Sequence, residues 1–147
     1  MSRKAMQTKI ITGEKVVYSF SPQHKPVGHV APKEKILLEI ADAFGGQVNN
    51  EHTLVDRLDW SKVNGATGPI FVNSAEPGDT LAIHIEQIRL PQQGIIALIP
   101  NQGILKNRTF KAMAKAVPIR DEHVHFENDT KLKARPMIGT IGVAPPR

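Results

Sequence analysis

A tight turn at Pro77-Gly78 constrains the fold more than any other feature of this sequence. Proline presets the backbone angle of the first turn position, and glycine supplies the positive φ that a type II turn requires at the second. Residues 70–73 before the turn and residues 80–90 after it have the composition of strands. The sequence therefore predicts two strands joined by a reversal, which is the architecture of a β-sheet.

The longer of these runs, residues 80–90, has the period of a strand that is buried on one face. Leu81, Ile83 and Ile85 take alternate positions, and alternate side chains of a strand point to the same side of its sheet. The alternation changes phase at Glu86-Gln87, as an extra residue in a β-bulge makes it do. We therefore expect one long strand with a bulge.

Proline and glycine divide the whole chain into short segments. The 147 residues include 11 Pro and 11 Gly, which leave little room for long helices. Hydrophobic residues make up 40% of the chain, and a chain of this length forms one domain with one substantial core. The sequence predicts a single all-β domain over residues 1–147, with at most one or two short helices.

Charge, hydropathy and cysteine content narrow the classes of function. The net charge is +5, but Lys and Arg are scattered and few aromatic residues are available to stack on bases, so we expect no nucleic-acid partner. No apolar run has the length of a membrane span, and the start of the chain has no signal-peptide pattern, which predicts a cytoplasmic protein with no membrane contact. Because the chain has no Cys, metal ligands would be carboxylate, imidazole or backbone oxygen.

Residues 32–46 fit a helix and also a strand. Pro32 at a first helical position, apolar residues at helical spacing and Gly45 as a C-cap favour the helix. Apolar residues also alternate over residues 36–40, and in a strand of that phase Asp42 points inward, where its charge needs a partner or a metal. The pattern alone favours the helix, in which Asp42 is solvated.

The segments after the long run give a mixed pattern. Residues 105–116 have a helical composition for a turn or two, although a strand is also open. Residues 117–120 and 124–126 predict a pair of strands.

Asp121, His123 and His125 lie at alternate positions and would share one face of a strand, which is the start of a carboxylate and imidazole metal site. The structural interpretation is stronger, because the intervening apolar residues would turn these three side chains to water as ordinary residues of an edge strand. The chain also has no Gly-x-Ser-x-Gly, His-Glu-x-x-His or phosphate-binding motif. Motifs alone therefore assign no function.

The segment Asp42-Ala-Phe-Gly-Gly-Gln47 is the polar cluster that best suits a ligand. A carboxylate ends an apolar run, two glycines let the backbone approach closely, and an amide side chain follows. In the alternative interpretation, which the residues alone favour, Asp42 caps the loop and Gln47 is exposed.

Four segments, in order along the chain, resemble a known family. They are Asp42-Ala-Phe-Gly-Gly-Gln47 and residues 58–72, 75–81 and 136–145. Together they resemble the acetamidase/formamidase family of amide hydrolases. The resemblance implies an antiparallel β-sandwich and a strand, rather than a helix, that delivers Asp42 toward the interior. It also implies that this chain corresponds to the N-terminal half of such an enzyme, because family members are about twice as long.

The family implies hydrolysis of the carbon–nitrogen bond of small linear amides, such as formamide or acetamide, to a carboxylate and ammonia. On this resemblance Asp42 is the catalytic residue, as a ligand of a divalent metal (zinc or calcium) or as the group that orients the attacking water, and Gln47 binds the substrate. A metal would polarise the amide carbonyl and lower the pKa of its bound water. The remaining part of the site would come from a complementary C-terminal half, so the isolated chain is expected to be inactive.

A non-catalytic β-sandwich module, left by truncation of such an enzyme, is the competing hypothesis. The apolar residues Met137, Ile138, Ile141 and Val143 support it, because exposed apolar surface favours a partner or a homo-oligomer. The glycines of this segment, Gly139 and Gly142, are expected to permit close packing rather than chemistry.

Overall fold

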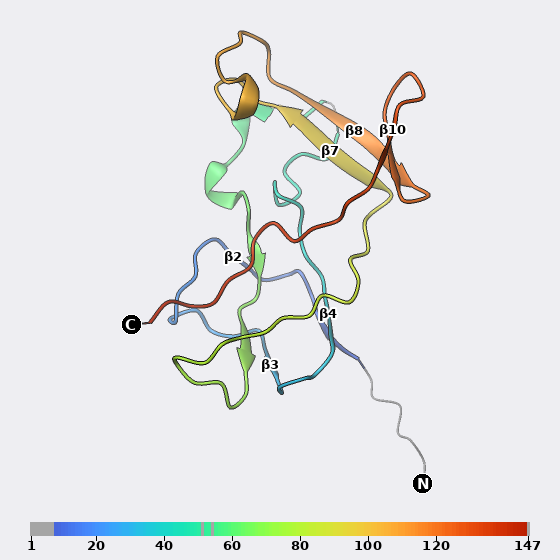
Figure 1. Ribbon diagram of the computed structural model, residues 1–147. Coiled ribbons are helices and arrows are strands. Elements are labelled where there is room, and N and C mark those ends of the chain that lie inside the picture. Colours follow the sequence, from blue (N-terminus) through green and yellow to red (C-terminus); the bar gives the residue numbers. More distant parts are fainter. Residues whose placement is uncertain (1–7, 51, 54, 147) are drawn as a thin grey trace. The chain divides into compact units, whose positions relative to one another are not determined.

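The computed structural model describes residues 8–50, 52–53 and 55–146 (Figure 1). Its strands are β1 (Lys9–Ile11), β2 (Val16–Val17), β3 (Gly28–Val30), β4 (Ile36–Leu38), β5 (Ala66–Thr67), β6 (Ile70–Val72), β7 (Gln93–Leu98), β8 (Met113–Arg120), β9 (His123–His125) and β10 (Lys131–Lys133). Three short 3-10 turns, η1 (Val55–Arg57), η2 (Trp60–Lys62) and η3 (Gly103–Leu105), complete the regular structure of the described residues. The prediction of an all-β fold is confirmed.

The chain folds into two compact units. Unit 1 contains the described residues of 1–43, 61–82 and 139–147, and unit 2 those of 44–60 and 83–138. The single β-sandwich domain over residues 1–147 therefore stays a prediction. Across both units, the described residues include no helix that is long and apolar enough to cross a membrane.

Unit 1 is built from three pairs of short strands. β1 pairs with β4 and β3 with β6 in parallel, whereas β2 pairs with β5 antiparallel. Ile11 and Val30 are the buried apolar residues of these strands. A Cβ added at Gly28 would lie 3.0 Å from Cδ1 of Ile11, so the glycine leaves room for this core side chain.

The turn at Pro77-Gly78 forms as the sequence predicts. The Asp79 amide donates to the Glu76 carbonyl over 3.1 Å, and Gly78 has a φ of 102°. The Asp79 carboxylate also accepts a hydrogen bond from the Glu76 amide at 2.9 Å. Local residues are sufficient to form this turn, because proline and glycine fix both of its central positions.

Gly142 lies in unit 1 against an aromatic ring. A Cβ at Gly142 would be 2.7 Å from Cε2 of Phe20, whereas a Cβ at Gly139 would meet nothing within 4 Å. The prediction of close packing is therefore confirmed for Gly142 and wrong for Gly139.

Unit 2 is organised on an antiparallel sheet in the order β10-β9-β8-β7, whose two longest strands, β7 and β8, lie side by side in Figure 1. The register pairs Gln93 with Pro118 at one end of β7 and Leu98 with Met113 at the other. The predicted pairing of residues 117–120 with residues 124–126 is confirmed, since Ile119 lies opposite Val124.

The hydrophobic core of unit 2 joins the sheet to the loop before η1. Its buried members are Val48, Val55, Leu58 and Ala114, and partly buried Phe44, Ile95, Ala97, Ile99 and Ala112 pack against them. Val48 and Val55 each keep 1% of their surface exposed. Residues 44–60 are therefore held on the sheet by apolar packing.

Both helices that the pattern allowed are absent. The pattern's preference for a helix in residues 32–46 is wrong, because residues 36–38 form β4 and pair with β1, as the resemblance implied. The helical composition of residues 105–116 is also overridden, because residues 113–116 belong to β8 and pair with β7. In both segments a strand distant in sequence supplies hydrogen-bond partners that outweigh local propensity.

The predicted strand over residues 80–90, with its bulge, is wrong for this structure. None of these residues forms a strand, and Figure 1 draws the segment between β6 and β7 without an arrow. The alternating apolar side chains are exposed, by 44% for Leu81, 55% for Ile83 and 50% for Ile85. The described part of the chain provides no neighbouring strand for this segment, and a strand exists only with a partner.

Candidate functional site

Asp42 lies in unit 1 on a segment that is anchored on both sides. Before it, the Glu39 amide donates to the Ile11 carbonyl at 2.9 Å, and the Glu39 carbonyl accepts from Oγ1 of Thr67 at 2.8 Å. After it, the Ala43 carbonyl accepts from the Asn64 amide at 2.7 Å. These contacts, one of them to β1 and two to residues 61–82, fix the backbone that carries the carboxylate.

The Asp42 side chain itself is exposed. The resemblance implied a carboxylate directed toward the interior, and that implication is wrong for this chain by itself. No charged or polar side chain is buried among the described residues. The structure therefore presents Asp42 at the surface of unit 1.

Gln47 lies in unit 2, half-buried, and pairs with the main chain. Its Nε2 donates to the Phe44 carbonyl at 3.0 Å and to the Asp59 carbonyl at 3.2 Å, and its Oε1 accepts from the Asp59 amide at 2.9 Å. The side-chain amide thus engages Asp59 in both directions, as a neighbouring strand would. Both amide hydrogens are used, which gives Gln47 a structural role that neither sequence interpretation included.

We expect Gln47→Ala to destabilise unit 2 by about 1–2 kcal/mol, because the Asp59 amide and two carbonyls lose their partner and regain it only in part from water. Chemical unfolding followed by tryptophan fluorescence measures this, since Trp60 is the one Trp in the chain. Gln23→Ala is the matched control, because Gln23 is exposed and its side chain makes no hydrogen bond within the described residues. Equal unfolding midpoints for the two variants would refute the structural role.

The two glycines between these residues set the path of the loop. Gly45 has a φ of 61° and Gly46 a φ of 76°, a region that residues with a Cβ rarely adopt. A Cβ at Gly46 would meet nothing within 4 Å. The glycines thus meet a conformational requirement of the loop, and close approach of its backbone to a ligand stays a prediction.

Metal-ligating side chains do not gather in the described part of the chain. Within residues 8–50, 52–53 and 55–146, no group of three or more His, Asp or Glu is placed to hold a metal ion. Nδ1 of His123 lies 2.6 Å from the Asp121 carbonyl, and Nε2 of His125 lies 3.3 Å from the Arg120 carbonyl. Both histidines are half-buried and Asp121 lies in the turn before β9, so the prediction that all three are turned to water on one face of a strand was wrong. The description as an edge strand was also wrong, because β9 lies between β8 and β10.

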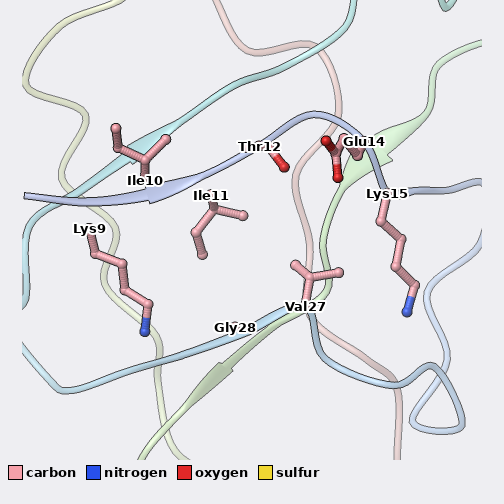
Figure 2. Close-up of a pocket in the computed structure, with 8 residues that line it drawn as sticks. All are labelled: Lys9, Ile10, Ile11, Thr12, Glu14, Lys15, Val27 and Gly28. Atoms are coloured by element: carbon pink, nitrogen blue, oxygen red, sulfur yellow. The ribbon is translucent and has the colours of Figure 1, made fainter.

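A hollow of about 240 Å³ opens in unit 1 among β1, β3 and the turn that follows β1 (Figure 2). Its walls include the apolar Ile11 and Val27, with Lys9 and Lys15 on either side. The Lys9 ammonium donates to the His29 carbonyl, and the Lys15 ammonium donates to the Lys25 carbonyl at 2.9 Å. Both cations are thus bound to the backbone, and none of the predicted site residues lines this hollow.

A second hollow, of about 310 Å³, opens in unit 2. Val55, Trp60, Ile99, Pro100, Asn101 and Gln102 line it. No ionisable side chain is among them, so the hollow offers apolar and amide contacts and no acid or base.

An ion pair between Lys115 and Glu127 lies on the sheet of unit 2. Nζ of Lys115 is 2.6 Å from Oε1 of Glu127. The hydrogen bond from Lys115, and then its charge, lower the pKa of the Glu127 carboxyl below its usual value. Both side chains are exposed and neither is a predicted site residue, so this pair belongs to the surface of the sheet.

Comparisons with known proteins give one consistent result. A family model described as the Acetamidase/Formamidase family matches residues 5–147. The solved structure of an acetamidase from Bacillus halodurans is 30% identical in sequence, with a TM-score of 0.88. The match covers 92% of this chain and 46% of the acetamidase chain. That of a predicted acetamidase/formamidase from Thermoanaerobacter tengcongensis is 35% identical with a TM-score of 0.88, and covers 94% and 46%. That of an acetamidase from Yersinia enterocolitica is 27% identical with a TM-score of 0.83, and covers 95% and 47%.

The chain therefore spans about half the length of each of these solved structures.

Proposed function

The chain belongs to the acetamidase/formamidase family, and from that premise we propose that it is the N-terminal part of an amide hydrolase which acts only together with the rest of the family's length. The observation that carries this proposal is the family match over residues 5–147 in a chain that spans about half of its solved relatives. The part of the active site that lies in the remaining length must come from a complementary C-terminal half.

The proposed reaction is hydrolysis of a small linear amide such as formamide or acetamide. The oxygen of water adds to the carbonyl carbon, the carbon–nitrogen bond breaks, and the nitrogen takes up a proton and leaves as ammonia. A carboxylate that accepts the proton of the attacking water, or orients that water, accelerates such a step by about 10²–10⁴-fold.

Asp42 is the group that we assign to this role. Its exposed carboxylate and the anchored segment on which it lies support the assignment. A fixed backbone with an accessible carboxylate lets the second half complete a site around it without rearrangement of unit 1.

A divalent metal, zinc or calcium, remains part of the proposal only as a group shared with the second half. The described residues of this chain do not fit a metal site by themselves, because they bring no group of three ligating side chains together. Asp42 is the ligand that this chain would contribute.

Gln47 is proposed to act by holding the loop of residues 44–47 in place. The three hydrogen bonds of its side chain with the main chain support this role. Its direct contact with the substrate stays a prediction.

A binding or assembly module without catalysis is the second candidate function. Three of the four apolar residues that suggested it are exposed, by 74% for Met137, 56% for Ile141 and 64% for Val143, while Ile138 is half-buried. In this case the chain would assemble with itself as a homo-oligomer or with another protein. The cytoplasmic location and the absence of a nucleic-acid partner stay predictions in both cases.

The test measures ammonia released from formamide and acetamide by this chain alone, by the chain mixed with the remaining half of the Thermoanaerobacter tengcongensis relative, and by a chimaera in which the two are joined. Each sample is assayed with added zinc, with added calcium and without metal, and the intact relative is the reference. We expect ammonia from the mixture or the chimaera and none from the chain alone. A folded chimaera that releases none with either amide would overturn the amidase proposal and favour the assembly module.

A further inference from the structure

Residues 80–90 are an exposed segment with the sequence of a strand and no strand partner. All of them are exposed except the half-buried Ile88, and the apolar alternation places Leu81, Ile83 and Ile85 on one side. The stretch 81–85 contains no Asp, Glu, Lys or Arg. Soluble proteins seldom leave such a run uncovered, because it is a template for pairing with another chain.

Each end of this segment is held within its own unit. At one end the turn at Pro77-Gly78 is closed by the hydrogen bond from Asp79 to Glu76, of 3.1 Å. At the other end the Gln92 carbonyl accepts from the Ile119 amide at 2.7 Å, and β7 begins at Gln93. Each flank of the segment is thereby held by a hydrogen bond within its own unit, which leaves fewer residues to be ordered when a partner strand arrives.

No backbone hydrogen bond is formed by residues 81–85 with any other described residue. Donors and acceptors that are open on an exposed apolar strand are satisfied in assembled proteins by addition of a strand from the partner. The solved relatives are about twice as long as this chain. We therefore take a second half of comparable size as the partner that provides the missing strand.

We infer that residues 80–90 become a β-strand by pairing with a strand of the second half, with Ile83 and Ile85 buried at the contact. This inference rests on the proposed function, because the partner strand belongs to the second half of the proposed amide hydrolase. Strand addition provides affinity through main-chain hydrogen bonds, and the alternate isoleucines provide specificity.

Hydrogen exchange of the wild-type chain tests the strand directly. In the chain alone the amides of residues 81–85 should exchange rapidly, and in a complex with the second half of the Thermoanaerobacter tengcongensis relative they should become protected. A complex that leaves these amides unprotected overturns the inference. Protection that appears in the chain alone as its concentration rises overturns the assigned partner in favour of a second copy of this chain.

The double substitution Ile83→Lys, Ile85→Lys tests the contact. Two charges in a buried patch should weaken association by about 100-fold or more, measured by titration calorimetry. Ile104→Lys is the matched control, because Ile104 is equally apolar and fully exposed, and it should change affinity by less than about threefold. Thermal unfolding of the free chain should be the same for all variants, since the substituted side chains are exposed.

The outcomes separate this inference from the amidase proposal. A complex with protected amides that releases no ammonia would leave the strand pairing standing and reject the proposed reaction. An active mixture in which the double variant binds as tightly as the wild type would reject the strand pairing alone. Failure of the wild-type chain to bind the second half would overturn the inference.

Discussion

Asp42→Ala is expected to reduce the rate of ammonia release by the assembled enzyme by about 10²–10⁴-fold. The change removes the carboxylate that we assign to activating or binding the attacking water, and loss of such a group costs about 10²–10⁴-fold. Asp42→Asn keeps the size and the hydrogen-bonding shape of the side chain but not its charge, so it should be nearly as inactive. The measurement is the initial rate at saturating amide with the chain and its complementary half together.

Two comparisons keep this result specific to Asp42. Asp129→Asn removes another exposed carboxylate, at a position with a φ of 56° that Asn also adopts, and should leave the rate unchanged. The unfolding midpoint of Asp42→Ala should remain close to that of the wild type because the side chain is exposed, and the rates are compared with enough second half to saturate the chain. Retained activity in the Ala variant would refute the catalytic assignment.

Val48→Asp is expected to unfold unit 2. Val48 keeps only 1% of its surface exposed, and it packs in the cluster with Val55, Leu58 and Ala114. A carboxylate at this position would lose water without gaining a partner, which costs about 4 kcal/mol or more, a large part of the stability of a domain. Loss of the cooperative urea transition reports the effect.

Milder and matched substitutions show whether burial is the cause. Val48→Ala should cost about 2 kcal/mol, from the lost apolar burial and the cavity left behind. Val143→Asp changes the same residue type where 64% of it is exposed, and should cost less than about 0.5 kcal/mol. If Val48→Asp and Val143→Asp unfolded at the same urea concentration, the cluster around Val48 would not be the core of unit 2.

The sequence predicted best what depends on neighbouring residues. The turn at Pro77-Gly78 formed because its two residues determine their own backbone angles. The pairing of β8 with β9 was also predictable, since both strands follow one another within a few residues. The all-β class followed from the frequency of proline and glycine, which is a property of composition.

The wrong predictions concern segments whose structure depends on residues distant in the sequence, which a local sequence pattern does not reveal. The helix preferred for residues 32–46 gave way to β4 because β1 lies beside it, and β1 is more than twenty residues earlier in the chain. Gln47 binds Asp59, twelve residues away, so neither interpretation of its side chain found its contacts. The strand over residues 80–90 was predicted from the alternation of apolar and polar residues. The apolar side chains of this segment are exposed in this chain, and no strand forms.

The prediction of Asp42 as a site residue was limited in the same way by contacts that the local sequence does not reveal. Asp42 was singled out by its position at the end of an apolar run, and its catalytic role was implied by the family resemblance. The pattern alone predicted a solvated Asp42, whereas the resemblance implied an inward side chain, and in this chain Asp42 is exposed. The inward or outward orientation of a side chain depends on what covers it.

The exposed stretch Leu81-Ala-Ile-His-Ile85 has a consequence for the life of the chain in a cell. Chains made in excess of their partner would display an uncharged, extended segment of the kind that chaperones hold and proteases cleave, and that promotes aggregation. We expect unassembled copies to be degraded. The amount of this protein in the cell should therefore follow the amount of its partner.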